Sequence, residues 1–197
     1  MIPFSVVPFV EHWLGYVWLA LFIIWVLAGL LSKRTAQAQT GSSRLFQAGI
    51  TFIGIMLIFN FNNWFVSGWL TTRIIPHEPA YVLGGAILTI AGILFSLWAR
   101  AILGTNWSAT VTIKENHTLI RRGPYQIVRH PIYTGFLLGL LGTSFVYGFA
   151  RCFVGILVVG LGFWLKSQTE EQFMVQQFGQ QYLNYRQQVR ALIPYVL

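Results

Sequence analysis

Residues 121–135 read RRGPYQIVRHPIYTG, and this stretch decides the fold because it carries a dense group of basic side chains to the start of a long apolar run. The pair Gly123-Pro124 predicts a turn. Pro131 stands where the apolar run 132–149 begins, and the first turn of a helix tolerates proline. We therefore expect the charged side chains at a helix entrance. A positive-inside anchor for a membrane span explains the arginines equally well, and both interpretations stay open for Arg121, Arg122 and Arg129.

The composition around this stretch is that of an integral membrane protein. Of the 197 residues, 55% are hydrophobic and 9% are charged, which is too apolar for a soluble domain of this size. The net charge of +8 would suit a nucleic acid, but the charges lie between apolar runs and not on one polar face. We therefore expect contacts with membrane lipids and none with nucleic acid. The only cysteine, Cys152, excludes an internal disulfide and a cysteine metal cluster.

Apolar runs along the chain predict about five membrane-spanning helices. They cover residues 13–31, 45–65, 81–98, 132–149 and 152–165. The last two runs are separated only by Ala150 and Arg151, which predicts a tight helical hairpin. In the third run, glycines predict close contact with a neighbouring helix, namely Gly84, Gly85 and Gly92.

The basic residues are distributed unevenly between the loops. If the N-terminus lies outside and the C-terminus in the cytoplasm, only Arg73 and Arg151 lie outside. The cytoplasmic side then holds Lys33, Arg34, Arg44, Arg100, Lys114, Arg121, Arg122, Arg129, Lys166, Arg186 and Arg190. This bias predicts that topology. The first residues lack a basic region and a small-residue cleavage site, so we do not expect a removable signal peptide.

Two polar segments flank the last hairpin. Residues 100–130 form the long polar stretch of the chain, and the alternation around residues 111–113 predicts an extended strand or hairpin over the membrane face. Residues 169–192 carry an apolar stripe at helical spacing, which predicts one amphipathic helix. Glu170 and Glu171 stand at its predicted start, where helix capping is the simplest explanation for both.

Metal binding has weak support in the sequence. His77 and Glu78 are adjacent in a short loop, and they would need further ligands from elsewhere to hold an ion. We therefore expect no metal site.

Three ordered segments carry a resemblance to a known family. They are LGTNWS at 103–108, HTLIRRGPYQIVRHPIYTG at 117–135 and TEEQFMVQQFGQQYLNY at 169–185, followed by a final Ile-Pro. The set resembles the isoprenylcysteine carboxyl methyltransferases and the wider group of small membrane methyltransferases that includes phospholipid N-methyltransferases. The resemblance covers residues 104–194, and the first two spans show nothing diagnostic.

The resemblance implies an all-α integral membrane protein in which the C-terminal half forms a cytoplasmic cofactor pocket. Residues 1–100 would be a transmembrane region of three spans, and 101–197 the methyltransferase catalytic region. The implied cofactor is S-adenosylmethionine. The positions that match the family's cofactor residues are His117, Thr118, Leu119, Ile120, Tyr125, His130, Pro131, Ile132, Tyr133 and Glu170.

Two cations are candidates for positioning the substrate. Lys166 stands where the eukaryotic prenylcysteine enzymes have an arginine associated with substrate, so the charge is kept and the bidentate fork is lost. Arg129 precedes the fourth span and Lys166 follows the fifth, and antiparallel neighbours bring such ends together. We expect the pair to receive an anionic group, with headgroup anchoring as the alternative.

The chemistry of methyl transfer favours an acidic oxygen as nucleophile. A carboxylate is already ionised near neutral pH, whereas a thiol or an ammonium must first lose a proton to a base. The chain has no aspartate and few glutamates, so a dedicated base is scarce. We expect carboxyl O-methylation of a lipophilic, isoprenylcysteine-like molecule, and N-methylation of a phospholipid and S-methylation of a thiol stay open.

Two other classes of protein explain part of the pattern. A sterol-type reductase using NADPH resembles the Arg-His-Pro-x-Tyr element, but such enzymes are larger. A transporter or channel subunit explains the spans and leaves the ordered motifs without a role. The sequence leaves the oligomeric state open.

Overall fold

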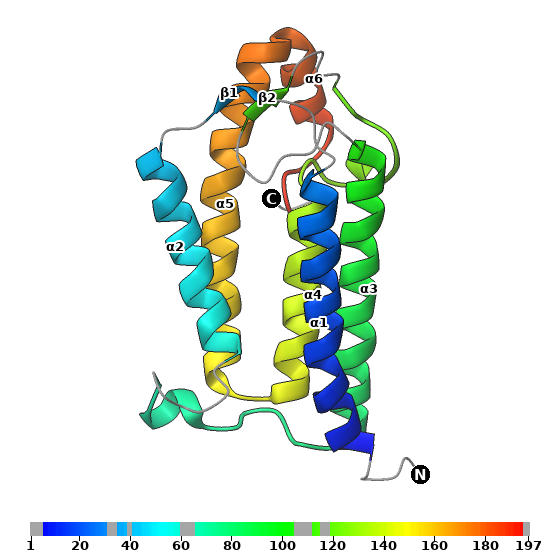
Figure 1. Ribbon diagram of the computed structural model, residues 1–197, viewed down its shortest axis with the longest axis vertical. Helices are drawn as coiled ribbons and strands as arrows, with labels where there is room; N and C mark the ends of the chain where they lie inside the picture. The colour runs from blue at the N-terminus through cyan, green and yellow to red at the C-terminus, as the bar shows by residue number, and fades with distance from the viewer. Residues whose placement is uncertain are drawn as a thin grey trace.

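The computed structural model describes residues 6–30, 35–38, 41–59, 66–104, 112–114 and 119–194. Long helices stand side by side and make an upright bundle (Figure 1). In chain order the elements are α1 (Val6–Leu30), β1 (Thr35–Ala38), α2 (Gly41–Ile58), the 3-10 helix η1 (Gly68–Thr71), α3 (Pro79–Leu103), β2 (Thr112–Lys114), the 3-10 helix η3 (Gly123–Gln126), α4 (Pro131–Tyr147), α5 (Ala150–Phe178) and α6 (Gln180–Gln188).

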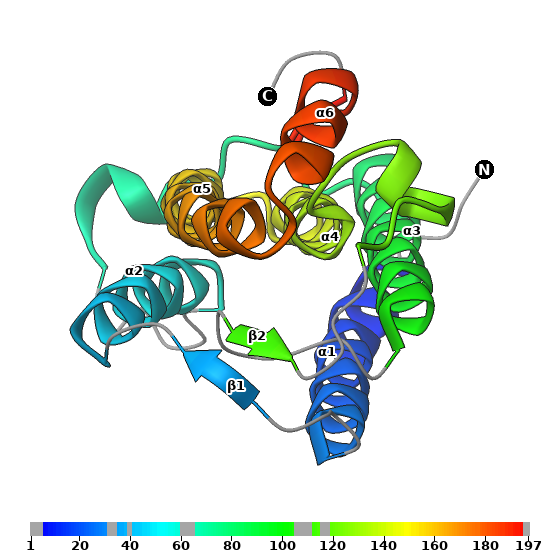
Figure 2. The same cartoon turned by 90° about the horizontal axis from the view of Figure 1, so that it is seen from above.

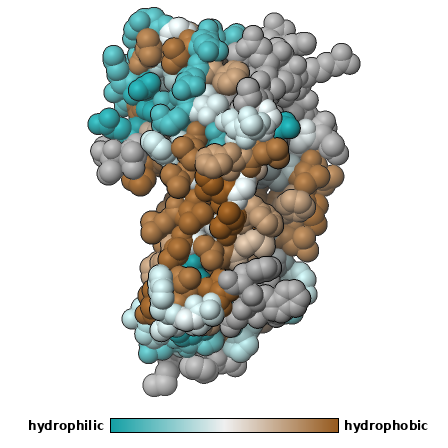
Figure 3. All heavy atoms as spheres, turned by 90° about the vertical axis from the view of Figure 1, so that its left-hand side faces the viewer, coloured by the Kyte–Doolittle hydropathy of each residue, from teal (hydrophilic) through white to brown (hydrophobic). Residues whose placement is uncertain are grey.

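The helices are those of a multi-pass membrane protein. Four of the described helices, α1, α2, α3 and α5, are long and apolar enough to cross a bilayer. The fifth, α4, is equally apolar but has 17 residues, or about 26 Å of helix. On the face that Figure 3 shows, hydrophobic side chains cover the middle of the molecule and hydrophilic side chains gather towards both ends. The predicted all-α membrane fold is confirmed.

Viewed along the bundle, the helices follow an arc in the order α2, α5, α4, α3, α1 (Figure 2). Helix α4 packs along α3, and α5 packs along α2. Glycines make both contacts close, because a Cβ on Gly85 would lie 2.6 Å from the carbonyl oxygen of Gly142, and one on Gly54 2.8 Å from that of Gly155. The prediction was right for Gly85 and Gly92, but Gly84 has no atom within 4 Å of its Cβ position.

A small sheet lies across the open side of the arc. Strand β2 pairs antiparallel with β1, which comes from the segment between α1 and α2. The predicted extended segment is therefore confirmed for residues 112–114, with a partner far away in the sequence. Residue 111 lies outside the described residues.

The last span continues much further than predicted. Helix α5 has 29 residues, or about 43 Å, which exceeds a hydrocarbon core of about 30 Å. It ends at Phe178, and Gly179, whose φ of +51° favours glycine, separates it from α6. The prediction of one tail helix over 169–192 was wrong. Glu170 and Glu171 lie inside α5 and cannot cap its start.

The two ends of the bundle are referred to below as the α6 end and the hairpin end. At the α6 end, the segment after α6 lies beside the entrance of α4, because Arg129 N donates to Arg190 O at 2.7 Å and His130 N to Ala191 O at 3.0 Å. At the hairpin end, α4 stops at Tyr147 and α5 starts at Ala150, so the predicted hairpin is confirmed. Its turn is Gly148 and Phe149, whereas the predicted turn residues, Ala150 and Arg151, lie inside α5.

Candidate active site

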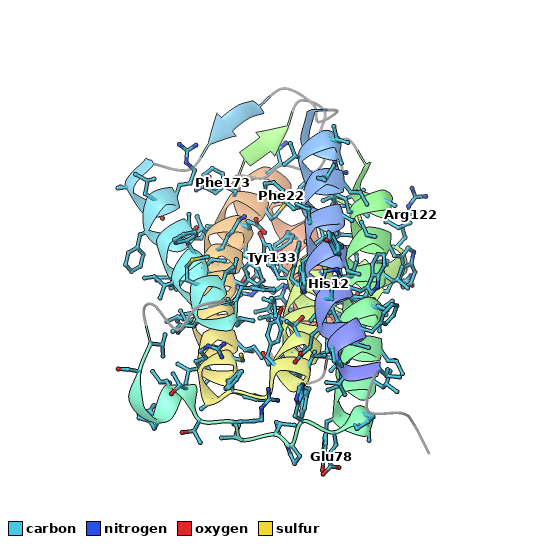
Figure 4. All side chains as sticks on the ribbon, turned by 60° about the horizontal axis from the view of Figure 1, so that its bottom comes forward. His12, Phe22, Glu78, Arg122, Tyr133 and Phe173 are labelled. Atoms are coloured by element: carbon cyan, nitrogen blue, oxygen red, sulfur yellow. The ribbon has the colours of Figure 1, made fainter. Side chains whose placement is uncertain are left out.

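The α6 end brings together side chains from the entrance of α4 and from the last turns of α5. His130 is the residue just before α4, and Tyr133 lies one turn further along the chain. Glu170 and Glu171 come from α5, whose final turns extend beyond the hydrocarbon thickness. The side chain of Tyr133 lies between α4 and α5 (Figure 4). This cluster is the candidate active site.

Glu170 is held in place but remains accessible. Its Oε1 accepts a short hydrogen bond from the Tyr133 hydroxyl, and its Oε2 lies 3.3 Å from His130 Nδ1. The side chain is 24% exposed. A fixed carboxylate with free surface is suited to accept hydrogen bonds from a ligand.

Glu171 is the buried member of the pair, with 4% of its side chain exposed. Its Oε1 accepts hydrogen bonds from Arg129 Nε at 2.9 Å and Arg129 Nη2 at 2.6 Å, and it lies 3.2 Å from His130 Nε2. Arg186 Nε lies 3.7 Å from the second oxygen. The two neighbouring glutamates therefore differ. Glu171 neutralises buried cations, whereas the carboxylate of Glu170 is partly accessible to a ligand.

His130 joins the two carboxylates through its two ring nitrogens. Burial alone would lower the pKa of this imidazole. The hydrogen bonds and negative charges of Glu170 and Glu171 outweigh that effect, so the pKa of His130 is raised. With both nitrogens donating, the ring is the charged form and fixes the orientation of both glutamates.

A stack of aromatic rings continues from this cluster into the bundle. The ring centroids of His130 and Tyr133 are 5.6 Å apart, with an interplanar angle of 9°. Tyr133 stacks in turn on Phe163 of α5 at 4.8 Å and 19°. Lys166 places its Nζ 5.4 Å from the centroid of the Tyr133 ring.

The two predicted substrate cations have partners within the protein. Arg129 binds Glu171 and also donates through Nη1 to the carbonyl oxygens of Arg186 and Val189. The anion facing Arg129 in the structure is thus a protein carboxylate. Lys166 contacts the Tyr133 ring. Their action on a substrate remains a prediction.

Most other predicted cofactor residues lie around the entrance of α4. Tyr125 and Ile132 are buried in a cluster with Ala99, and Ile120 packs against it. Burial raises the pKa of Tyr125, which keeps its hydroxyl neutral. Leu119 is partly buried and Pro131 is buried, whereas His117 and Thr118 lie outside the described residues.

Sequence reasoning missed the role of Glu171 and the participation of Phe163. The signal for Glu171 was the scarcity of carboxylates, since a buried Arg129 needs an anionic partner. In the same way, the loop histidine has a different partner from the one considered: His77 Nε2 lies 2.9 Å from Glu11 Oε1. Among the described residues no group of three His, Cys, Asp or Glu side chains could hold a metal ion.

Comparison with known proteins defines the class first. Residues 80–181 match the family model described as phospholipid methyltransferase, which spans α3 to the start of α6. The fold resembles a solved eukaryotic intramembrane Ras methyltransferase, isoprenylcysteine carboxyl methyltransferase, with a TM-score of 0.51 and 22% identity. The match covers 80% of this chain and 54% of that chain. The class is therefore an integral membrane protein with a methyltransferase fold.

Sequence relatives narrow the class. Protein-S-isoprenylcysteine O-methyltransferase B of Arabidopsis thaliana is 32% identical over 168 residues, which are 85% of this chain and 77% of the relative. Protein-S-isoprenylcysteine O-methyltransferase of Schizosaccharomyces pombe is 37% identical over 99 residues, 47% of this chain and 41% of the relative. This chain belongs to the isoprenylcysteine carboxyl methyltransferase family.

Proposed function

We propose that this protein transfers a methyl group from S-adenosylmethionine to the carboxylate of an isoprenylcysteine-like substrate in the membrane. The observation that carries the proposal is the accessible Glu170, fixed by Tyr133 and His130 where the polar α6 end meets the aromatic interior. The family relationship supports the reaction class. Because the chain covers only part of several relatives, its substrate is inferred from the site and the family together.

The residues present fit S-adenosylmethionine. This cofactor has an amine and ribose hydroxyl groups, which donate hydrogen bonds that a carboxylate can accept. It also has a cationic sulfonium, which aromatic faces stabilise. Glu170 is 24% exposed, while the adjacent Glu171 is engaged by Arg129. Glu170 would hold the amine or the ribose, and Tyr133 and the other predicted cofactor residues would line the remaining contacts. When bound, the cofactor supplies an electrophilic methyl group.

The protein's part in the reaction is to hold and orient the reactants. Methyl transfer is an in-line displacement, so most of the acceleration can come from near-attack positioning. A carboxylate nucleophile needs no base, whereas His130, the titratable base of the cluster, has both nitrogens engaged by glutamates. The geometry therefore supports O-methylation over reactions that require removal of a proton. Lys166, beside Tyr133, would attract the substrate carboxylate.

The apolar part of the substrate would remain within the bilayer. A lipid chain gains about 0.8 kcal/mol for each CH₂ buried in an apolar site, which favours lateral entry of a lipidated molecule. We place the α6 end on the cytoplasmic side, with the N-terminus outside, on the distribution of basic residues. Site-directed labelling of cysteines introduced at each end, in sealed vesicles, tests this topology.

A methyl-transfer assay with tritiated S-adenosylmethionine tests the function. The purified protein in nanodiscs is offered farnesylcysteine, a phospholipid amine and a small thiol, and the products are treated with base. A volatile, base-labile label on farnesylcysteine is expected, because methyl esters hydrolyse. The family model favours phospholipid N-methylation as the second candidate, and a base-stable label on the phospholipid would establish that reaction instead.

A further inference from the structure

The interior of the bundle changes in character between its two ends. Towards the hairpin end it is filled, and Val7, Val82 and Val146 are each 0% exposed. Towards the α6 end the inner side chains form an aromatic column, which we define as Tyr133, Phe163, Phe136, Trp25 and Trp18. All five are only partly buried. Interiors are normally close-packed, so partial exposure of large rings at this depth indicates room for a ligand beside them.

The aromatic column is continuous. From the Tyr133–Phe163 stack, Phe163 approaches Phe136 at 6.2 Å between centroids. Phe136 meets Trp25 edge-on at 5.0 Å and stacks on Trp18 at 6.3 Å. These rings come from α1, α4 and α5. Helices α1 and α5 lie on opposite sides of α4 in the arc (Figure 2), and rings from both helices contact Phe136 of α4.

Trp18 closes the column, and its ring is held from several sides. Its Nε1 donates a hydrogen bond to Thr143 Oγ1 at 2.9 Å, within the apolar part of the bundle. Its six-membered ring lies 3.2 Å from the position that a Cβ on Gly139 would occupy, so the missing side chain of this glycine makes the recess for the ring. Phe59, which follows α2, meets Trp18 edge-on at 5.9 Å.

Beyond Trp18 the space is occupied by the protein itself. Trp18 packs on the buried cluster of Val7, Leu14, Val82 and Val146. It also packs on the second cluster, Ile58, Leu140 and Val159. A chain entering from the site therefore meets a filled interior at the level of this tryptophan.

We infer that Trp18 is the floor of the site for the substrate's lipid chain and determines the length of chain that the enzyme accepts. The inference rests on the proposed function, because it takes the reactive end of the substrate to lie at Glu170 and Tyr133. Along α4, Tyr133 lies about 9 Å from Gly139 and about 15 Å from Thr143, the two residues that seat the Trp18 ring. A chain lying on the aromatic column has that depth available.

The test compares methyl transfer to farnesylcysteine and to geranylgeranylcysteine, which is one isoprene unit longer. In Trp18→Ala the floor is removed, and the ratio of kcat/KM for the longer over the shorter chain should rise about tenfold or more. Phe9→Ala is the matched control, since Phe9 is an aromatic residue on the opposite face of the same helix, is 62% exposed, and should leave the ratio unchanged.

Two milder variants keep the inference testable if Trp18→Ala folds poorly. Trp18→Phe shortens the ring system and should raise the ratio less. Gly139→Ala adds a methyl group 3.2 Å from the Trp18 ring, displaces it by a few tenths of an ångström and should lower the ratio. Changes in opposite directions would establish Trp18 as the floor, because general loss of stability changes both substrates alike.

An unchanged ratio in folded Trp18→Ala and Trp18→Phe, with farnesylcysteine still methylated, would overturn the inference and leave the proposed function intact. Absence of transfer to either prenylcysteine by the wild-type protein would instead remove the proposed function. Thermal unfolding of each variant identifies the folded ones.

Discussion

The two ends of the bundle bury charge in different ways. At the α6 end, the Glu171 carboxylate forms an ion pair with Arg129 and lies beside His130, and all of these side chains are almost completely buried. At the hairpin end, Arg73 and Arg151 both lie over the Phe149 ring, at 4.7 and 4.3 Å from its centroid. The cation–π contact of Arg73, which is only partly buried, contributes little, whereas a buried ion-pair network needs every member. Within the part of the chain that the structure describes, the α6 end is the one with a buried group of acidic and basic side chains beside an accessible carboxylate.

The largest effect is expected from breaking the buried network. Glu171→Gln leaves Arg129 without an anionic partner, so the free energy of unfolding should fall by about 3 kcal/mol. Denaturant titration in detergent measures it. Glu170→Gln is the matched control, and its stability loss should be smaller because that side chain is 24% exposed. Equal losses in the two variants would mean that the roles of the glutamates have been assigned wrongly.

A smaller effect, on turnover, is expected at Lys166. Lys166→Ala should lower kcat/KM for methyl transfer about tenfold and leave the affinity for the cofactor nearly unchanged, because the ammonium group is assigned to the substrate carboxylate. Lys166→Arg should keep activity on prenylcysteine carboxylates or raise it. If Lys166→Ala retains full turnover and loses only membrane insertion, this lysine is a headgroup anchor.

A variant of Arg129 distinguishes a role in substrate binding from a role in the stability of the fold. Because its guanidinium group is engaged by Glu171 and by two carbonyl groups, Arg129→Ala should lower stability and turnover together. A loss of turnover without a loss of stability would return Arg129 to the role of a substrate residue.

The pH dependence of stability should reflect His130 at the α6 end. Its pKa is raised in the folded state by Glu170 and Glu171, so the folded protein holds this proton more tightly than the unfolded chain. Its contribution is complete below the unfolded pKa of about 6.5 and is lost as pH rises through the higher folded value. Unfolding measured from pH 6 upward should show a stability that falls as pH rises, by at most about 1.4 kcal/mol per pH unit for one proton, and His130→Gln should lack this fall. An identical slope in both proteins would contradict this.

The smallest effect is expected at the hairpin end. Arg73→Ala removes one cation over Phe149 and should cost less than about 1 kcal/mol, with methyl transfer unchanged. Thermal unfolding and the transfer assay measure both quantities. A loss of turnover as large as that of Lys166→Ala would show that the hairpin end also takes part in catalysis.

The sequence predicted the parts of the structure that depend on local patterns. Apolar runs predicted the spans, and the short interval between the last two runs predicted the hairpin, with its turn placed two residues too late. Sequence reasoning missed both the continuation of α5 through residues 166–178 and the break at Gly179. Polar residues such as Ser167 and Thr169 occur inside helices as well as at their starts, so they do not mark where a helix begins. That error made Glu170 and Glu171 look like capping residues.

The contacts that define the site depend on distant parts of the chain. Arg129 and Glu171 are separated by 42 positions, and β1 pairs with β2 across two helices. No periodicity encodes such pairs. The ordered motifs indicated which segments lie together. Only the fold shows that the Glu170 side chain is partly exposed, whereas the Glu171 carboxylate is buried in an ion pair with Arg129.

Calorimetric titration of S-adenosylhomocysteine into the protein in nanodiscs tests the central claim most directly, because it needs no knowledge of the substrate. We expect micromolar or tighter binding by the wild type, about tenfold or greater weakening in Glu170→Ala and Tyr133→Ala, and unchanged affinity in Arg73→Ala at the other end. Absence of binding by folded wild-type protein, or equal weakening in all three variants, would contradict a methyl-donor site at Glu170.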